Sequence, residues 1–166
     1  MLEVRTYREG VAQMAGHDLI IDVGQWHATA EVSGDGALTS LELGVDPRSL
    51  EVREGLRGVK PLTDKDRTKI RAEIEGKILG VEPISFRSKA IESSGERLRV
   101  EGDLTVAGST RPVSYELGIS PEGRVHGTLP ITQTDFGITP YRGFMGTLKV
   151  RDAVEVAIDV QLPAAD

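Results

Sequence analysis

The sequence predicts an all-β fold, an antiparallel β-barrel of eight or nine strands with one or two short helices inserted in the middle of the chain. Three observations support this class. Segments of alternating apolar and polar residues recur along the chain, separated by turns rich in Gly, Pro, Ser and Asp. The chain has 166 residues, of which 39% are hydrophobic, enough for a single domain over residues 1–166 with its own core. Closing the sheet into a barrel would remove exposed strand edges, although a β-sandwich also fits the pattern.

The clearest element is a β-hairpin over residues 97–119, with the sequence RLRVEGDLTVAGSTRPVSYELGI. Apolar and polar residues alternate along both arms, which is typical of a sheet with one dry and one wet face. Gly108 and Ser109 supply turn chemistry between the arms, and Pro112 lies near the start of the second strand, where a missing N–H does least harm. The dry face is expected to carry Leu98, Val100, Leu104, Val106, Val113, Tyr115, Leu117 and Ile119, with Gly102 in step.

The N-terminal part of the chain predicts four strands in succession, with a possible helical turn over residues 11–15. Each strand shows alternation of period two, and short polar or glycine-containing segments separate them. The expected strands are residues 2–5, 18–23, 26–32 and 40–45. Four strands with short connections indicate an antiparallel meander.

The middle of the chain departs from this pattern of successive strands. A short helical turn is expected near residues 49–53, and a longer helix begins after Thr63, because Asp66 three residues later completes a pattern that resembles a capping box. Ile70, Ile74 and Ile78 follow at four-residue spacing, and Gly80 can end the helix. So narrow an apolar stripe predicts a surface helix that covers the β-core; a lid that admits a ligand is the alternative.

Three further strands are expected in the second half, at residues 84–90, 125–131 and 154–162. Between the last two lies an aromatic segment, residues 134–146, that contains too much Gly and Pro for a strand and predicts a loop. Small residues at inward positions, such as Ala28, Ala30 and Gly127, leave volume that either neighbouring side chains or a ligand must fill.

Composition excludes several classes of function. The formal net charge of −6 and a pI near 5.2 argue against a surface that binds nucleic acid. The absence of cysteine excludes disulfides, thiolate metal sites and sulfur nucleophiles. The N-terminal sequence MLEVRTYREG carries charges where a signal peptide needs an apolar run, and no run approaches the length of a membrane span. We therefore expect a cytoplasmic protein without an integral membrane segment.

Four segments together resemble a known family. They are GHDL at residues 16–19, EGDLTVAGSTRPV at 101–113, QTDFGI at 133–138 and VEVAIDVQL at 154–162. In this order they are similar to the YceI-like family of polyisoprenoid-binding, lipocalin-like proteins, and they span nearly the whole chain. The resemblance implies an extended eight-stranded antiparallel barrel with a helical excursion, a hydrophobic tunnel that holds an isoprenoid chain, and a homodimer. It implies no cofactor and no catalysis.

An isoprenoid tail offers no hydrogen bonds, so a site for it needs only a dry aliphatic tube, in which each buried CH₂ contributes about 0.8 kcal/mol. The ligand class implied by the resemblance is an isoprenoid, an isoprenoid quinone or a fatty lipid. Candidate lining residues, chosen by strand parity, are Leu19, Ile21, Trp26, Leu41, Leu43, Phe86, Leu104, Tyr115 and Leu129. Phe136, Tyr141, Phe144 and Met145 are candidates near a mouth of the tunnel. Plain core packing is the competing interpretation for each of them.

The polar candidates are few. His17, at the start of a strand, and Arg142, in the aromatic loop, are candidates for contact with a ligand head group, against the alternatives of a structural hydrogen bond and a solvated cation. The three histidines show no metal-ligand spacing, so no metal is expected. Two other functions stay open at this point. One is an enzyme that uses His17 and nearby carboxylates on a small apolar substrate, and the other is a filled barrel that serves protein interaction.

Overall fold

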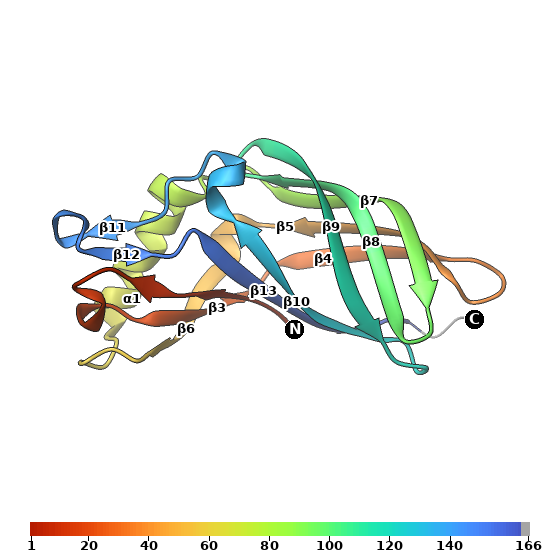
Figure 1. Cartoon of the computed structure of the whole chain (residues 1–166), viewed down its shortest axis with the longest axis horizontal. Helices are drawn as coiled ribbons and strands as arrows, with labels where there is room; N and C mark the ends of the chain where they lie inside the picture. The colour runs from red at the N-terminus through yellow and green to blue at the C-terminus, as the bar shows by residue number, and fades with distance from the viewer. Residues whose placement is uncertain (164–166) are drawn as a thin grey trace.

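The computed structural model describes residues 1–163 and shows an all-β architecture, which confirms the predicted class (Figure 1). Its main sheet has ten strands in the order β4-β5-β7-β8-β9-β10-β13-β1-β3-β6, all paired antiparallel. The sheet curls around a long axis. The strands are β1 (Leu2–Thr6), β3 (Asp18–Val23), β4 (Trp26–Val32), β5 (Leu38–Val45), β6 (Leu50–Leu56), β7 (Ile84–Ser94), β8 (Arg97–Val106), β9 (Ser109–Ile119), β10 (Arg124–Thr132) and β13 (Ala153–Gln161).

The prediction of eight or nine strands is wrong, because β6 was not expected. The predicted four-strand meander is also wrong, since two interruptions of the chain separate β3 from β4 and β5 from β6. β3 is followed almost at once by β4, and β5 by β6, with Gly24-Gln25 and Asp46–Ser49 at the breaks. The Gly24 N–H donates to the Ser49 carbonyl and the Asp46 N–H to the Gln25 carbonyl, each at 3.0 Å, so the two breaks lie side by side. On one side of the breaks β3 pairs with β6, and on the other side β4 pairs with β5. Within residues 1–163 no ladder joins the edge strands β4 and β6, so the sheet curls into a half-barrel and does not close into the predicted barrel.

The predicted hairpin over residues 97–119 is confirmed as β8 and β9, joined by a two-residue turn. Ala107 and Gly108 both have positive φ, at 49° and 75°, so the turn lies one residue earlier than expected and Ser109 already begins β9. Two positive φ angles give the twist that a two-residue hairpin needs. Every second residue of β8 from Leu98 to Val106 is buried, as the alternation predicts.

The expected helical turn near residues 49–53 is wrong, because β6 occupies these positions. Only Asp46 to Ser49 turn, through the 3₁₀ helix η2 (Pro47–Ser49), and Leu50 then enters a ladder with Val23. The charged residues Glu51 and Arg53 make this strand hard to recognise in the sequence. They are compatible with a strand because they lie on its solvent side. Arg53 forms ion pairs there with Glu3 at 2.8 Å and with Asp22 at 3.2 Å.

A second sheet of three short strands covers one end of the molecule (Figure 1). It consists of β2 (Arg8–Glu9), β11 (Arg142–Gly143) and β12 (Leu148–Val150), with the 3₁₀ helices η1 (Gln13–Ala15) and η5 (Phe144–Gly146) in its connections. The aromatic segment 134–146 is therefore a loop that includes the 3₁₀ helix η4 (Gln133–Phe136), η5 and one two-residue strand. Strands this short carry too few residues to show alternation in a sequence.

The helix after Thr63 is confirmed as α1 (Asp64–Glu73), continued by a π-helical turn, η3 (Ile74–Ile78). The capping box is present: the Asp66 N–H donates to the Thr63 hydroxyl and the Thr63 N–H to the Asp66 carboxylate. Gly80, at a φ of 68°, stands beyond its C-terminal end. No residue of α1 is fully buried, so the helix lies on the sheet surface, as predicted.

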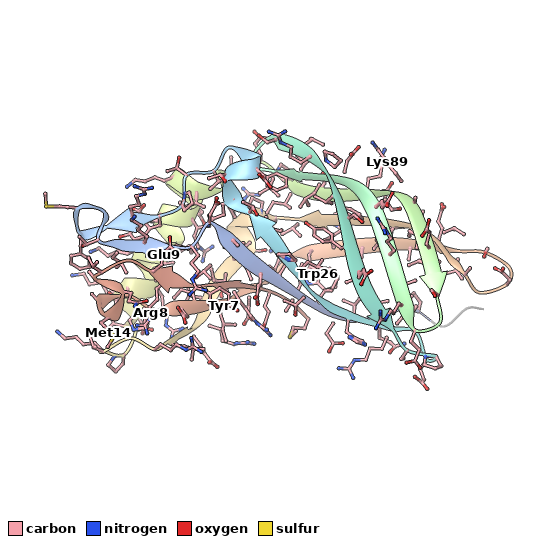
Figure 2. The ribbon with its side chains drawn as sticks, viewed as in Figure 1. Tyr7, Arg8, Glu9, Met14, Trp26 and Lys89 are labelled. Atoms are coloured by element: carbon pink, nitrogen blue, oxygen red, sulfur yellow. The ribbon has the colours of Figure 1, made fainter. Side chains whose placement is uncertain are left out.

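Two apolar clusters lie inside the curled sheet. The larger one centres on buried residues of β7, β8, β9 and β10 with Phe136 and Ile138, and the smaller one on residues of β1, β3, β5 and β6. Leu43, Leu79, Ile84 and Ile158 pack against both clusters. Trp26, at the start of β4, lies near the middle of the long axis and packs against the smaller cluster (Figure 2). The candidate site lies on the side of the larger cluster.

Candidate functional site

The main sheet has a gap in its pairing between β9 and β10. Their ladder contains two residue pairs, Val125 with Ile119 and His126 with Gly118. By contrast, β8 pairs with β9 over ten positions, from Arg97 with Gly118 to Val106 with Ser109. Figure 1 shows β9 and β10 together at one end and diverging towards η4. Along most of their length, β9 and β10 therefore do not pair with each other, and the facing edge of each strand is unpaired.

The diverging strands border a cleft of about 420 Å³, called here the β9–β10 cleft. This volume falls in the range of about 300–1,000 Å³ typical of small-molecule sites. Residues that are consecutive in sequence line it on both strands, and consecutive residues of a strand point to opposite faces. The cleft therefore runs along the facing edges of the two strands, with inward-facing and outward-facing residues in its lining. Its lining residues are Val113, Ser114, Tyr115, Glu116, Thr128, Leu129, Pro130, Ile131, Thr132, Asp135 and Phe136.

Close packing limits the cleft at both ends. At the narrow end, a Cβ on Gly127 would lie 2.7 Å from Cδ2 of Leu117, so the Leu117 side chain packs directly against β10 there. At the wide end, the Arg111 guanidinium donates to the Asp135 carbonyl at 2.8 Å. Phe136 is buried beside this bond in the larger apolar cluster. These contacts hold η4 against β9 and fix the opening.

The inner side of the cleft is apolar and incompletely covered. Val113, Leu129 and Ile131 pack against the larger cluster, yet each of them remains partly exposed. Leu98 and Val100, which lie inside the sheet where pairing is complete, are each only 2% exposed. The cleft therefore presents apolar surface that the protein itself does not cover.

Tyr115 is the polar group on this inner side. Burial raises the pKa of the Tyr115 hydroxyl above its ordinary value, with no hydrogen bond contributing to the shift. Tyr7, in contrast, donates a hydrogen bond to the Glu155 carboxylate at 2.8 Å, and this bond is the first cause of its raised pKa. The Tyr115 hydroxyl is thus available to a polar group of a ligand.

A second cleft of about 410 Å³ lies beyond the narrow end, around the turns that precede β8 and β10. Its lining includes the apolar Leu117 and Ile119 beside Glu96, Arg97, Ser120 and His126. Glu116 lines both clefts. The first cleft differs from the second in that it follows the unpaired edges of β9 and β10.

The structure separates the predicted lining residues into three groups. Tyr115, Leu129 and Phe136 line the β9–β10 cleft. Seven others face the two apolar clusters inside the sheet, three of them buried and four partly exposed. The buried ones are Ile21, Phe86 and Leu104, and the partly exposed ones are Leu19, Trp26, Leu41 and Leu43, of which Leu43 packs against both clusters. Tyr141, Phe144 and Met145 are exposed at the end covered by β2, β11 and β12, away from the cleft.

Neither head-group candidate lies on the cleft. The Nε2 atom of His17 lies 2.6 Å from the Lys60 carbonyl, and the ring packs against Gly55 and Gly58. Arg142 is exposed on β11. The neighbour of His17, Asp18, is buried and accepts a hydrogen bond from the Arg8 N–H at 2.9 Å. His17 and Asp18 therefore make separate structural contacts and form no acid–base pair with each other.

Sequence reasoning missed Val113 and Ile131 as lining residues, and it missed the cleft itself. Two prolines in the sequence indicated the incomplete pairing at the cleft. Pro112 lies within β9 and Pro130 within β10, and proline in a strand interior is confined to positions where the missing N–H would face no partner. Prolines in two adjacent strands indicate that these strands do not pair fully with each other.

Comparison with known proteins agrees with this architecture. A profile of the YceI-like domain matches residues 12–162. The chain belongs to the YceI-like family. The family predicted from the four sequence segments is thereby confirmed. No curated protein matches the chain significantly.

Among solved structures, Burkholderia cenocepacia BcnA is similar over 95% of this chain and 94% of its own, with 18% identity and a TM-score of 0.67. A G34C mutant of CJ YCEI reaches a TM-score of 0.64 at 13% identity, over 88% of this chain and 85% of its own. Campylobacter jejuni YCEI gives 0.59 with the same identity and coverage. At these identities the structures establish the shared fold.

Within residues 1–163, no three His, Asp or Glu side chains gather closely enough to hold a metal ion. None of the helices in this range is long and apolar enough to cross a membrane.

Proposed function

We propose that this protein binds the apolar chain of an isoprenoid, isoprenoid quinone or fatty lipid inside the curled sheet, with the β9–β10 cleft as the entrance, and that it carries or sequesters this lipid without catalysis. One observation supports the proposal above the others. The side chains that face inward from β9 and β10 are aliphatic and lie on an apolar cluster, yet they remain partly exposed. A ligand that covers them gains about 0.8 kcal/mol for each buried CH₂.

The family supports the same ligand class, since YceI-like proteins share a lipocalin-like, polyisoprenoid-binding fold. Tyr115 adds a preference within this class. Its half-buried hydroxyl would donate a hydrogen bond to a carbonyl or hydroxyl oxygen of a head group, which favours a prenyl alcohol or a quinone over a pure hydrocarbon. The homodimer expected from the family stays a prediction.

The enzyme alternative gains no support from the contacts of His17. Its Nε2 atom is engaged with a backbone carbonyl, and its neighbour Asp18 is held by Arg8 and Arg57. An acid–base catalyst needs a ring nitrogen that can reach a substrate proton.

The first test is organic extraction of freshly purified protein, followed by mass spectrometry of the extract. A prenyl lipid in amounts comparable to the protein supports the proposal. In parallel, geranylgeraniol is titrated into delipidated protein while the fluorescence of Trp26, the single tryptophan, is recorded. Saturable binding that also raises the melting temperature is expected, because a ligand of the folded state stabilises it.

A pair of variants makes the test specific to the cleft. Leu129→Gln places an amide on the inner side of β10, and Thr29→Gln places the same amide at an exposed position of β4, outside the cleft. Losing the contact between Leu129 and the ligand is expected to weaken geranylgeraniol binding by about tenfold or more. Thr29→Gln should bind within about twofold of the unchanged protein, as is typical of exposed substitutions. Equal affinities of the two variants would place the ligand elsewhere.

A further inference from the structure

Three loops meet at the end of the molecule opposite the β4–β5 turn and form one surface, called here the loop end. They are residues 10–16, 57–61 and 141–149, and Figure 1 shows β2, β11 and β12 at this end. Backbone hydrogen bonds join them: the Ala12 N–H donates to the Thr147 carbonyl at 2.9 Å and the Val59 N–H to the Met14 carbonyl at 3.3 Å. Met14 is labelled at this end in Figure 2.

The loop end exposes an unusual share of large apolar side chains. Each of its three loops contributes at least one: Val11 and Met14 from the first, Val59 from the second, and Phe144 and Met145 from the third. Val11 is 90% exposed, and Met145 is fully exposed. Single exposed apolar residues are ordinary, but five gathered on one surface mark a place of interaction.

The backbone conformation of the loop over residues 141–149 directs two of these side chains, Phe144 and Met145, into solvent. Phe144 and Met145 both adopt left-handed backbone conformations, with φ of 48° and 57°. Non-glycine residues seldom occupy this region, and strained positions concentrate at functional sites. Thr147 holds the loop, donating from its hydroxyl to the Phe144 carbonyl at 2.6 Å. The fold therefore maintains a strained loop that carries its largest apolar side chains into solvent.

The charge of the loop end is opposite to that of the whole chain. Acidic residues outnumber basic ones by 26 to 20 over the sequence. In the three loops, however, every charged residue is basic: Arg57, Lys60, Arg142 and Lys149. Two acidic residues lie next to them. Glu9 stands beside Lys149 in the small sheet, and the buried Asp18 lies 3.4 Å from Arg57.

We propose that the loop end docks on an anionic phospholipid surface. Its apolar side chains enter the boundary between head groups and acyl chains while its cations contact phosphates, the combination that holds interfacial proteins on membranes. The remaining acidic surface is repelled by the same membrane, so the loop end is the part that faces it. A second copy of the chain is a poorer occupant, because a two-fold contact would bring the same cations from both subunits together.

The test is flotation of the purified full chain with vesicles of phosphatidylcholine alone and with vesicles in which part of it is replaced by phosphatidylglycerol. Binding is expected to the second kind and to weaken as salt is added, because exposed charges are screened. The double variant Phe144→Ser/Met145→Ser should partition about tenfold more weakly or worse. Arg142→Gln/Lys149→Gln should lose about fivefold for each cation on the phosphatidylglycerol vesicles, with little change on phosphatidylcholine.

Two control variants match these changes at the other end of the molecule. Val32→Ser removes an exposed apolar side chain beside the β4–β5 turn, and Lys89→Gln removes an exposed cation of β7 (Figure 2). Both should partition like the unchanged protein. All substituted residues are exposed except Lys149, which is partly exposed, so melting temperatures should stay close together and exclude unfolding as the cause. Met145→Gly serves as a further check, since glycine accepts the left-handed conformation while removing the side chain.

Three results would overturn the proposal. The first is no binding to either kind of vesicle, and the second is equal loss in the control and loop-end variants. The third is self-association that the loop-end substitutions abolish while vesicle binding is absent, which would assign the surface to a second copy. None of these readouts depends on what the interior of the sheet holds, so the lipid-carrier proposal stands or falls separately.

Discussion

Two neighbouring parts of one sheet differ in how completely they are closed. The closed wall, formed by β7, β8 and β9, is paired along nearly its whole length, with one bulge at Lys89, and it buries Leu98 and Val100 almost entirely. The β9–β10 cleft begins on the other edge of β9, where pairing ends after two positions. Both regions carry the same aliphatic side chains on the inner face. The difference shows that backbone pairing, rather than side-chain chemistry, decides which of them forms a core and which remains partly exposed.

The largest difference is expected from truncating one leucine in each region. Leu98→Ala removes a side chain that is 2% exposed, which typically costs about 2–5 kcal/mol. Leu129→Ala, at the partly exposed edge of the cleft, should lower the free energy of unfolding by about 1 kcal/mol or less. Urea denaturation measures both. Equal losses would mean that the cleft is packed as tightly as the wall.

The two inward glycines provide a comparison of intermediate size. A Cβ on Gly102, in the wall, would overlap the Arg87 carbonyl oxygen and lie 2.8 Å from the Ser88 Cα, so backbone would have to move. A Cβ on Gly127 would meet only the end of the flexible Leu117 side chain. Gly102→Ala should therefore cost about 1–3 kcal/mol, as overpacking does, and Gly127→Ala clearly less. Thermal unfolding of both variants measures these losses, and geranylgeraniol affinity is a second readout. A larger loss of stability in Gly127→Ala than in Gly102→Ala would mean that the narrow end of the cleft is more rigid than the wall.

A smaller effect concerns the pH dependence of stability through Tyr115. Burial raises the pKa of its hydroxyl in the folded protein, so folding favours the neutral phenol. This contribution is complete below the pKa of an unfolded tyrosine, about 10, and is lost as pH rises through the higher folded value. Tyr115→Phe should flatten the fall of unfolding free energy above that pH. Urea denaturation on either side of it is the measurement, and an unchanged slope would place the hydroxyl in water.

The smallest effect is expected at an ion pair far from the cleft. Burial alone would raise the pKa of Glu3, but hydrogen bonds and charges of Arg5 and Arg53 outweigh it and hold the pKa below its ordinary value. The pair therefore adds stability above the ordinary pKa of a glutamate, about 4.3, and loses it as pH falls below. Glu3→Gln should remove that acid dependence without changing ligand affinity. A change in affinity would show that the two halves of the sheet are coupled.

Elements with local, regular alternation were predictable from the sequence. The hairpin of β8 and β9 follows from the alternation between Leu98 and Ile119, and α1 from Thr63, Asp66 and the isoleucine stripe. These signals lie within a few residues of one another, where propensity and burial agree. Their geometry needed no knowledge of distant partners.

The ten-stranded order and the cleft were not predictable in this way. Whether β9 pairs with β10 beyond His126 depends on where η4 is held, and a contact between Arg111 and the Asp135 carbonyl holds it. Period-two alternation places Leu129 and Ile131 on an inner face but cannot tell whether a neighbouring strand covers them. The sequence thus predicted on which face of the sheet the lining residues lie, but it did not predict the cleft between β9 and β10.

Hydrogen exchange with and without geranylgeraniol tests the central claim most directly, because it reports on the free strand edges themselves. Without ligand, amides within residues 113–117 and 127–132 that face the cleft should exchange faster than the amides of β8, which have partners on both sides. The account predicts that bound geranylgeraniol slows exchange at these positions and leaves the wall unchanged. Saturating ligand without any change along the β9–β10 cleft would contradict it.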